Sequence, residues 1–166
     1  MRPAISDRAL LYLLAAVTAL GPVTTNLYLP ALPFVREYFG ATVAEVQSTF
    51  SIALVTFSFG LLAWGPIADK YGRRNAILAG VAVHVVGALI CLVAPTLGWL
   101  IVGRAIQAFG TATGMVVARA IVVDRYPIER MVRMLASLTM VAVLGNSLAP
   151  VLGGFLATGL GWRSVF

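Results

Sequence analysis

The amino-acid sequence predicts an all-α membrane protein that crosses the bilayer with five helices. Of its 166 residues, 60% are hydrophobic and only 11% are charged, whereas a soluble domain carries about a quarter charged residues. The mean hydropathy is +0.96. Four long stretches carry no charge, namely residues 9–35, 46–68, 75–103 and 134–162. Each exceeds the roughly 20 residues that cross a ~30 Å hydrocarbon core as a helix.

These stretches predict helices over residues 9–30, 46–67, 75–94 and 134–160, and a further helix over 99–123 is interrupted by Arg104 and Arg119. The first could instead be a signal peptide, because a basic segment precedes it. Its apolar run continues past Leu29 without a cleavage site, so we retain it as a helix. The second is expected to end at Gly65-Pro66, where proline interrupts helical hydrogen bonding and charges follow.

The distribution of Lys and Arg predicts the orientation. A cytoplasmic N-terminus places two cations outside, Arg36 and Arg163, and Arg104 within the membrane. It places the rest inside, which are Arg2, Arg8, Lys70, Arg73, Arg74, Arg119, Arg125, Arg130 and Arg133. Cytoplasmic loops of membrane proteins are rich in Lys and Arg, so we expect an inside N-terminus. The net charge of +6 therefore reflects topology and indicates no nucleic-acid partner.

Residues 65–74, Gly-Pro-Ile-Ala-Asp-Lys-Tyr-Gly-Arg-Arg, resemble the loop between the second and third helices of the major facilitator superfamily, in the form common among drug/proton antiporters. Gly65 would let another helix pack closely. Asp69 and Arg73 could pair with Asp124 to hold one conformation closed, with Gly65, Gly72 and Arg74 in the same gating set. A solvated surface cluster is the alternative, and any polytopic protein also needs a basic cytoplasmic turn.

Residues 20–33 and 117–124 resemble the Bcr/CflA-type drug-resistance branch of that superfamily. Thr18, Pro22 and Thr25 form a polar stripe, with Asn26 at its margin, that should face a cavity. Relatives in the branch often carry an acidic residue at Asn26. An amide cannot release a proton near neutral pH, so Asn26 either lines the substrate or proton pathway without titrating, or bonds a neighbouring helix.

Residues 104–110, Arg-Ala-Ile-Gln-Ala-Phe-Gly, resemble the fourth-helix pattern of the superfamily. Arg104, Gln107 and Thr111 share one helical face. A buried arginine is costly, so a cavity or an anionic partner is expected, and snorkelling to the outer surface is the alternative. The resemblance implies that Arg104 influences proton or substrate binding in a central cavity.

Residues 145–154 resemble the antiporter signature Gly-x-x-x-Gly-Pro-x-x-Gly-Gly, with Ala149 replacing the second glycine. Small residues let helices approach closely and Pro150 introduces a bend. This surface could slide between two transporter halves or serve static packing. Its members are Gly145, Ala149, Pro150, Gly153 and Gly154.

A shift of 89 residues aligns Gly65, Ala68, Gly72 and Arg74 with Gly154, Ala157, Gly161 and Arg163. The first copy is predicted inside and the second outside, as an inverted repeat of three plus three helices requires. A sixth helix should begin near Trp162. The resemblance implies that residues 1–166 form an incomplete N-terminal six-helix half, about five of twelve helices.

The resemblance implies proton-coupled export of small drug-like or amphipathic compounds by alternating access, in a bacterial inner membrane. Lipid, substrate, protons and a C-terminal half outside these residues would be its partners, with the proton gradient as energy source and no cofactor. No enzyme or metal motif is recognisable. All six acidic residues fall in loops or at helix ends, so either another part of the transporter supplies a coupling carboxylate or the protein is coupled differently. An importer of a small metabolite and a non-transporting truncated membrane protein remain alternatives.

Overall fold

The computed structural model describes residues 7–166, and within them every regular element is helical. The chain forms α1 (Asp7–Tyr28), η1 (Leu29–Ala31), α2 (Leu32–Phe39), α3 (Val43–Tyr71), α4 (Arg73–Val93), α5 (Leu97–Arg125), α6 (Ile128–Gly159) and η2 (Trp162–Val165). In this range, five helical stretches are long and apolar enough to cross a membrane, the first running from Ala9 through α2 to Phe39. The predicted all-α class with five spanning helices is confirmed.

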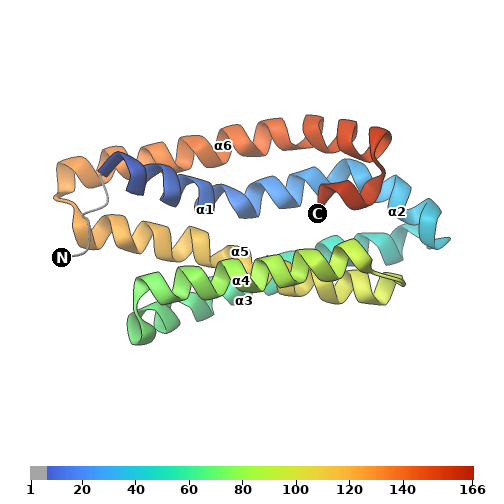
Figure 1. Ribbon diagram of the computed structural model, residues 1–166, viewed down its shortest axis with the longest axis horizontal. Helices are drawn as coiled ribbons and strands as arrows, with labels where there is room; N and C mark the ends of the chain where they lie inside the picture. The colour runs from blue at the N-terminus through green and yellow to red at the C-terminus, as the bar shows by residue number, and fades with distance from the viewer. Residues whose placement is uncertain (1–6) are drawn as a thin grey trace.

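The helices form two layers (Figure 1), with α1 and α6 side by side in one and α3, α4 and α5 in the other. The layers meet where α5 packs against α1. Two glycines of α5 make the close approaches possible. A Cβ at Gly110 would collide with the backbone of His84 in α4, and one at Gly114 with the carbonyl of Val17 in α1. Because α5 contacts α1, α3, α4 and α6, it lies at the centre of the bundle.

The end of α3 differs from the sequence prediction. Gly65-Pro66 was expected to end this helix, but Pro66 lies inside α3, which continues to Tyr71. A proline removes only one helical hydrogen bond, and the helix survives it here. The chain leaves α3 at Gly72, whose φ of 87° and ψ of 146° suit glycine alone. The other end begins with a capping box in which Thr42 and Glu45 satisfy each other's backbone N–H groups.

The first and last predicted helices are also longer than their apolar stretches. The chain stays helical from α1 to Phe39, because Pro30 and Pro33 fall in the first turns of η1 and α2, where a missing N–H costs little. The last helix, α6, begins at Ile128 rather than near residue 134. A helix can extend into water beyond the hydrocarbon core, so charge-free stretches underestimate its length.

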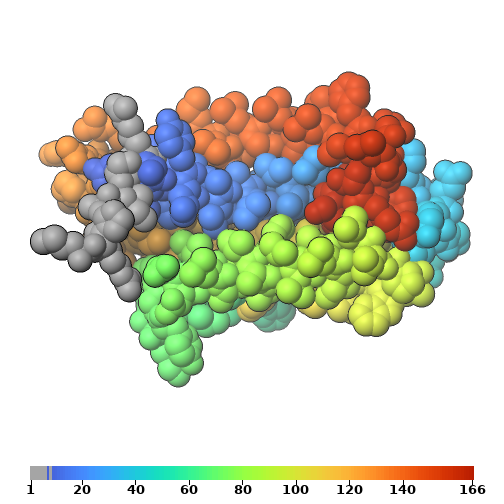
Figure 2. Space-filling model, viewed as in Figure 1, coloured from blue at the N-terminus to red at the C-terminus, as the bar shows by residue number. Residues whose placement is uncertain are grey.

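The 89-residue repeat has a counterpart in backbone conformation. Gly72 and Gly161 have the same φ of 87°, with ψ of 146° and 159°, and each directly precedes a new helix. They lie at opposite ends of the bundle. We call the end that contains Gly72 the Asp69 end; the start of α1 and the α5–α6 connection also lie there. We call the end that contains Gly161 the Trp162 end, which also holds α2 and the α4–α5 connection. Figure 2 shows the last residues, in red, lying against α2 in cyan.

Candidate functional site: a charge cluster, a buried arginine and an amide-lined cavity

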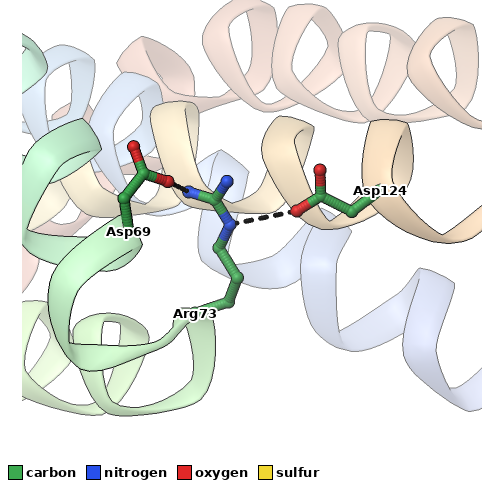
Figure 3. Close-up of polar contacts among 3 residues, drawn as sticks. All are labelled: Asp69, Arg73 and Asp124. Atoms are coloured by element: carbon green, nitrogen blue, oxygen red, sulfur yellow. Dashed lines mark hydrogen bonds and ion pairs between the residues drawn. The ribbon is translucent and has the colours of Figure 1, made fainter.

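Arg73 joins three helix ends at the Asp69 end, as Figure 3 shows. Its Nη1 lies 2.8 Å from Oδ1 of Asp69 near the end of α3, and its Nε donates to Oδ2 of Asp124 in α5 at 3.1 Å. The side chain of Arg73 is 30% exposed, whereas those of Asp69 and Asp124 are 65% and 56% exposed. We call these three residues the Arg73 cluster. Water reaches both carboxylates, so the pairs can form and break without burying a charge.

The other predicted members of the gating set do not join this cluster. Arg74 is exposed and forms no ion pair within residues 7–166. Gly72 provides the turn that places Arg73 between the two carboxylates. Gly65 was expected to permit close helix packing, but within residues 7–166 no helix packs closely there, since a Cβ at Gly65 would lie 4.0 Å from the nearest atom, Cγ1 of Val116. The close contact of α3 with α5 is at Gly60 instead, where a Cβ would lie 2.7 Å from Cβ of Ala112.

A second set of polar contacts connects α1 to the α5–α6 connection at the same end. The hydroxyl of Tyr126 donates to Oδ1 of Asp7 at 2.8 Å, and Nη1 of Arg130 lies 4.0 Å from Oδ2 of the same carboxylate. Burial, together with the hydrogen bond and negative charge of Asp7, raises the pKa of Tyr126. The phenol therefore remains a donor at neutral pH.

Arg104 lies deep in the bundle, only 2% exposed, so it does not snorkel to the surface. Its Nη1 donates to Oε1 of Gln107 at 2.9 Å, and its Cζ lies 4.5 Å from the ring centre of Tyr28 and 5.8 Å from that of Phe166. The Tyr28 hydroxyl lies 2.7 Å from Oγ1 of Thr49. Within residues 7–166 no carboxylate pairs with Arg104 and its Nε has no hydrogen-bond partner. Aromatic faces and one amide thus take the place of the expected anion.

Asn26 lines a pocket of about 180 Å³ between α1, α3, α5 and α6, and Arg104 is not among the residues that line it. Pro22, Thr25 and Asn146 also line this cavity, as does Phe57. The Asn26 amide donates one hydrogen bond to the Pro22 carbonyl at 2.8 Å and another to Oδ1 of Asn146 in α6. Part of the predicted polar stripe of α1 therefore does face a cavity, and Asn26 also bonds a neighbouring helix.

Of the four predicted pathway residues, only Arg104 and Gln107 are joined by a hydrogen bond within residues 7–166. Arg104 is bonded to Gln107, and Asn26 is bonded to Asn146. Thr111 is buried against Gly21. Its Oγ1 donates a hydrogen bond to the carbonyl of Ala108 in its own helix. A shared helical face predicted the position of Thr111 but not its neighbours. The sequence reasoning missed the aromatic partner of Arg104 and the second amide. Both lie within segments that carry the family resemblance.

The antiporter signature in α6 packs against α1. A Cβ at Gly145 would lie 2.8 Å from Cγ2 of Val23, Ala149 is buried, and a Cβ at Gly153 would collide with the carbonyl of Leu27. Gly154 is different, since nothing lies within 4 Å of its added Cβ. Gly145, Ala149 and Gly153 are therefore covered within residues 7–166, whereas Gly154 is not. Pro150 lies within the continuous α6.

Comparison with known proteins identifies the class to which this bundle belongs. Residues 14–166 match the model of the Major Facilitator Superfamily. The chain is therefore a member of the major facilitator superfamily of membrane transporters.

Curated relatives narrow this class. The chain is 33% identical over 151 residues to multidrug resistance protein MdtL of Klebsiella pneumoniae (strain 342), covering 91% of this chain and 38% of that protein. It is 31% identical over 157 residues to multidrug resistance protein D of Escherichia coli (strain K12), covering 95% and 40%. A bicyclomycin resistance protein homolog of Haemophilus influenzae is 28% identical over 153 residues, covering 92% and 38%. The resemblance to the Bcr/CflA-type branch is confirmed, and the chain spans about two fifths of the length of these relatives.

Proposed function

We propose that residues 1–166 belong to a longer transporter that exports small drug-like or amphipathic compounds from the bacterial cytoplasm across the inner membrane. The names of the relatives, multidrug and bicyclomycin resistance proteins, support export of such compounds. In this proposal the residues form most of an N-terminal six-helix half, and the Asp69 end faces the cytoplasm, because most of the Lys and Arg residues lie there.

The observation that carries the mechanism is the bridge made by Arg73 between Asp69 and Asp124. It links the end of α3, the start of α4 and the inner part of α5 with pairs that water can replace. We propose that the bridge favours one conformation of an alternating-access cycle and opens in the other. Proton entry would drive export, with the coupling carboxylate supplied by the part of the transporter beyond these residues.

The test is an accumulation assay with the full-length gene product in a bacterial strain whose own exporters are deleted. A panel of neutral and cationic antibiotics and fluorescent dyes should accumulate less in expressing cells, and a protonophore should abolish the difference. Faster uptake without efflux would favour the importer alternative. Unchanged accumulation of every compound would contradict transport by this protein and favour a non-transporting membrane protein.

The role of the Arg73 cluster is tested in the same cells. Asp69→Asn and Arg73→Ala should each reduce export severalfold, because each removes a contact that stabilises only one conformation. Arg74→Ala is the matched control, since Arg74 is adjacent, carries the same charge and lies outside the cluster. Equal export by all three variants and the wild-type protein would refute the proposed gate while leaving export itself unaffected.

A further inference from the structure

We propose that a hollow between the starts of α1 and α6 binds the phosphodiester headgroup of an anionic phospholipid from the cytoplasmic leaflet. The two helix starts lie side by side at the Asp69 end (Figure 1). The hollow, which we call the Arg133 pocket, has a volume of about 640 Å³ and is lined by Asp7, Leu11, Tyr126, Arg130, Arg133 and Met134. The inference goes beyond export and rests only on the cytoplasmic orientation proposed above for this end.

The charges of the Arg133 pocket leave one guanidinium without a counter-ion. Asp7 is the only carboxylate among the described lining residues, and both of its oxygens already face a partner. Oδ1 accepts from the hydroxyl of Tyr126 at 2.8 Å, and Oδ2 lies 4.0 Å from Nη1 of Arg130. Arg133 forms no ion pair within residues 7–166, and its Nε donates to the carbonyl of Glu129 at 3.4 Å. Its two Nη groups have no hydrogen-bond partner in that range, so they are available to an anion.

The Arg133 pocket spans the boundary between water and hydrocarbon, because its apolar residues lie deeper than its charged ones. Leu11 lies four residues, or about 6 Å, beyond Asp7 in α1. Met134 lies at the same interval beyond Arg130 and is the first residue of the charge-free stretch of α6. Both apolar side chains pack against the hydrophobic core. This order matches a phospholipid, whose phosphate lies at the membrane surface and whose acyl chains point inward.

An anionic phospholipid is the occupant that these features favour. The planar fork of an arginine binds a phosphodiester through two parallel hydrogen bonds, and the cytoplasmic leaflet presents anionic headgroups to cations beside the membrane. A zwitterionic lipid would also need a carboxylate for its cationic group, but Asp7 already faces Tyr126 and Arg130. A soluble phosphodiester would use the cations but not the apolar wall formed by Leu11 and Met134.

Native mass spectrometry of the full-length gene product in a neutral detergent tests the assignment. Dioleoylphosphatidylglycerol and dioleoylphosphatidylcholine are titrated separately, because they share their acyl chains and differ in net charge. We expect the wild-type protein to bind phosphatidylglycerol at least about fivefold more tightly, the effect of one arginine close to an anionic lipid. Arg133→Gln should remove most of this preference and leave the affinity for phosphatidylcholine unchanged. Arg133→Lys should recover part of it, because lysine keeps the charge but lacks the fork.

Arg119→Gln is the matched control, because Arg119 is also an exposed arginine in the inner part of α5 and does not line the Arg133 pocket. It should change the affinity for phosphatidylglycerol by less than about twofold, since salt screens the attraction of a charge outside the pocket. Asp7→Asn should instead strengthen binding, because it removes the negative charge of the pocket and releases Arg130. A residue that only stabilised the fold would not produce these opposite effects.

Equal affinity of the wild-type protein for the two lipids would overturn the inference. An unchanged preference in Arg133→Gln, or an equal loss in Arg133→Gln and Arg119→Gln, would do the same. Displacement of the lipid by an equal concentration of glycerophosphoglycerol, the same headgroup without acyl chains, would also overturn it, since the site would then accept a soluble phosphodiester. Binding is measured without transport, so failure here leaves the proposed export intact, and a failure of export leaves the lipid site intact.

Discussion

The two ends of the bundle use the same backbone turn to place very different arginine contacts. At the Asp69 end, Gly72 precedes Arg73, which pairs with two exposed carboxylates. At the Trp162 end, Gly161 has the same φ of 87° and precedes Trp162 and Arg163. The two copies of the repeat therefore share the backbone turn, but the arginine that follows the turn has different contacts in each copy.

Arg163 is held without any carboxylate in the described residues. Its Nε donates to the carbonyl of Leu92 at 3.1 Å, and its Nη2 donates to the carbonyl of Ala94 at 3.1 Å and to the hydroxyl of Tyr38 at 3.2 Å. Its Cζ also lies 4.5 Å from the ring centre of Tyr38 and 4.3 Å from that of Trp162. These contacts join η2 to α2 and to the end of α4. We call them the Arg163 cluster.

The difference indicates two physical roles. Exposed ion pairs are weak and screened by salt, so the Arg73 cluster can open at little cost. Hydrogen bonds from a guanidinium to carbonyls and its stacking on aromatic rings depend much less on salt. The Asp69 end is therefore suited to opening, and the Trp162 end to holding its helices together. Each prediction below tests this contrast in the full-length gene product.

The largest expected effect comes from the shared turn. Gly72→Ala and Gly161→Ala should each destabilise the protein by about 1–3 kcal/mol, because the φ of 87° strains any residue with a side chain. An added Cβ meets nothing within 4 Å at either position, so backbone strain alone causes the loss. Thermal unfolding in detergent measures it. Gly154→Ala, in open space within α6, is the control and should be neutral or slightly stabilising.

Equal losses at the two turns would sharpen the comparison, since they would show that the repeat conserves the backbone strain itself. If alanine is tolerated at Gly161 and lowers stability only at Gly72, the comparison between the two ends fails. The two ends would then share a sequence pattern but not a conformational requirement.

An intermediate effect is expected from the Arg163 cluster. Arg163→Gln should cost about 2 kcal/mol, because charged hydrogen bonds to carbonyls and stacking on two aromatic rings are lost together. The loss should be nearly the same in 0.05 M and 1 M NaCl. Arg163→Lys keeps the charge but not the planar fork, so it should recover only part of the stability. A full recovery by lysine, or a loss that disappears in high salt, would show that simple charge attraction holds this end.

The sequence predicted the fold more completely than the sites, because hydropathy reports burial in lipid directly. Five spanning helices follow from stretches that lack charge, whatever each residue contacts. The helix ends were harder to predict. Pro66 looked like an end, yet Gly72 is the residue whose conformation stops α3, and a positive φ cannot be recognised from a glycine in the sequence alone.

Pairs of residues were predictable only where a charge required a partner. Asp69, Arg73 and Asp124 were expected together, and the structure brings them together. Arg104 was expected beside an anion or an open cavity, but lies on the ring of Tyr28. An uncharged amide or aromatic ring does not require an oppositely charged partner, so its partner cannot be predicted from charge. Which residue it contacts depends on how the two helices are rotated relative to each other. For the same reason the bond between Asn26 and Asn146 was not foreseen.

The smallest expected effect on stability belongs to the Arg73 cluster. Arg73→Gln should cost less than about 1 kcal/mol, because exposed pairs gain little over their hydrated charges. Asp124→Asn should cost a similar amount, and the double variant should show a coupling of about 0.2–1 kcal/mol at 0.05 M NaCl that vanishes near 1 M, where the Debye length falls to about 3 Å. Unfolding of the four proteins at both salt concentrations measures this coupling. If it instead persists in 1 M NaCl at the size of the Arg163 effect, the Asp69 end is as firmly held as the other. Such a result would rule out the low-cost opening that the proposed gate requires, because a contact of that strength would keep one conformation populated throughout the cycle.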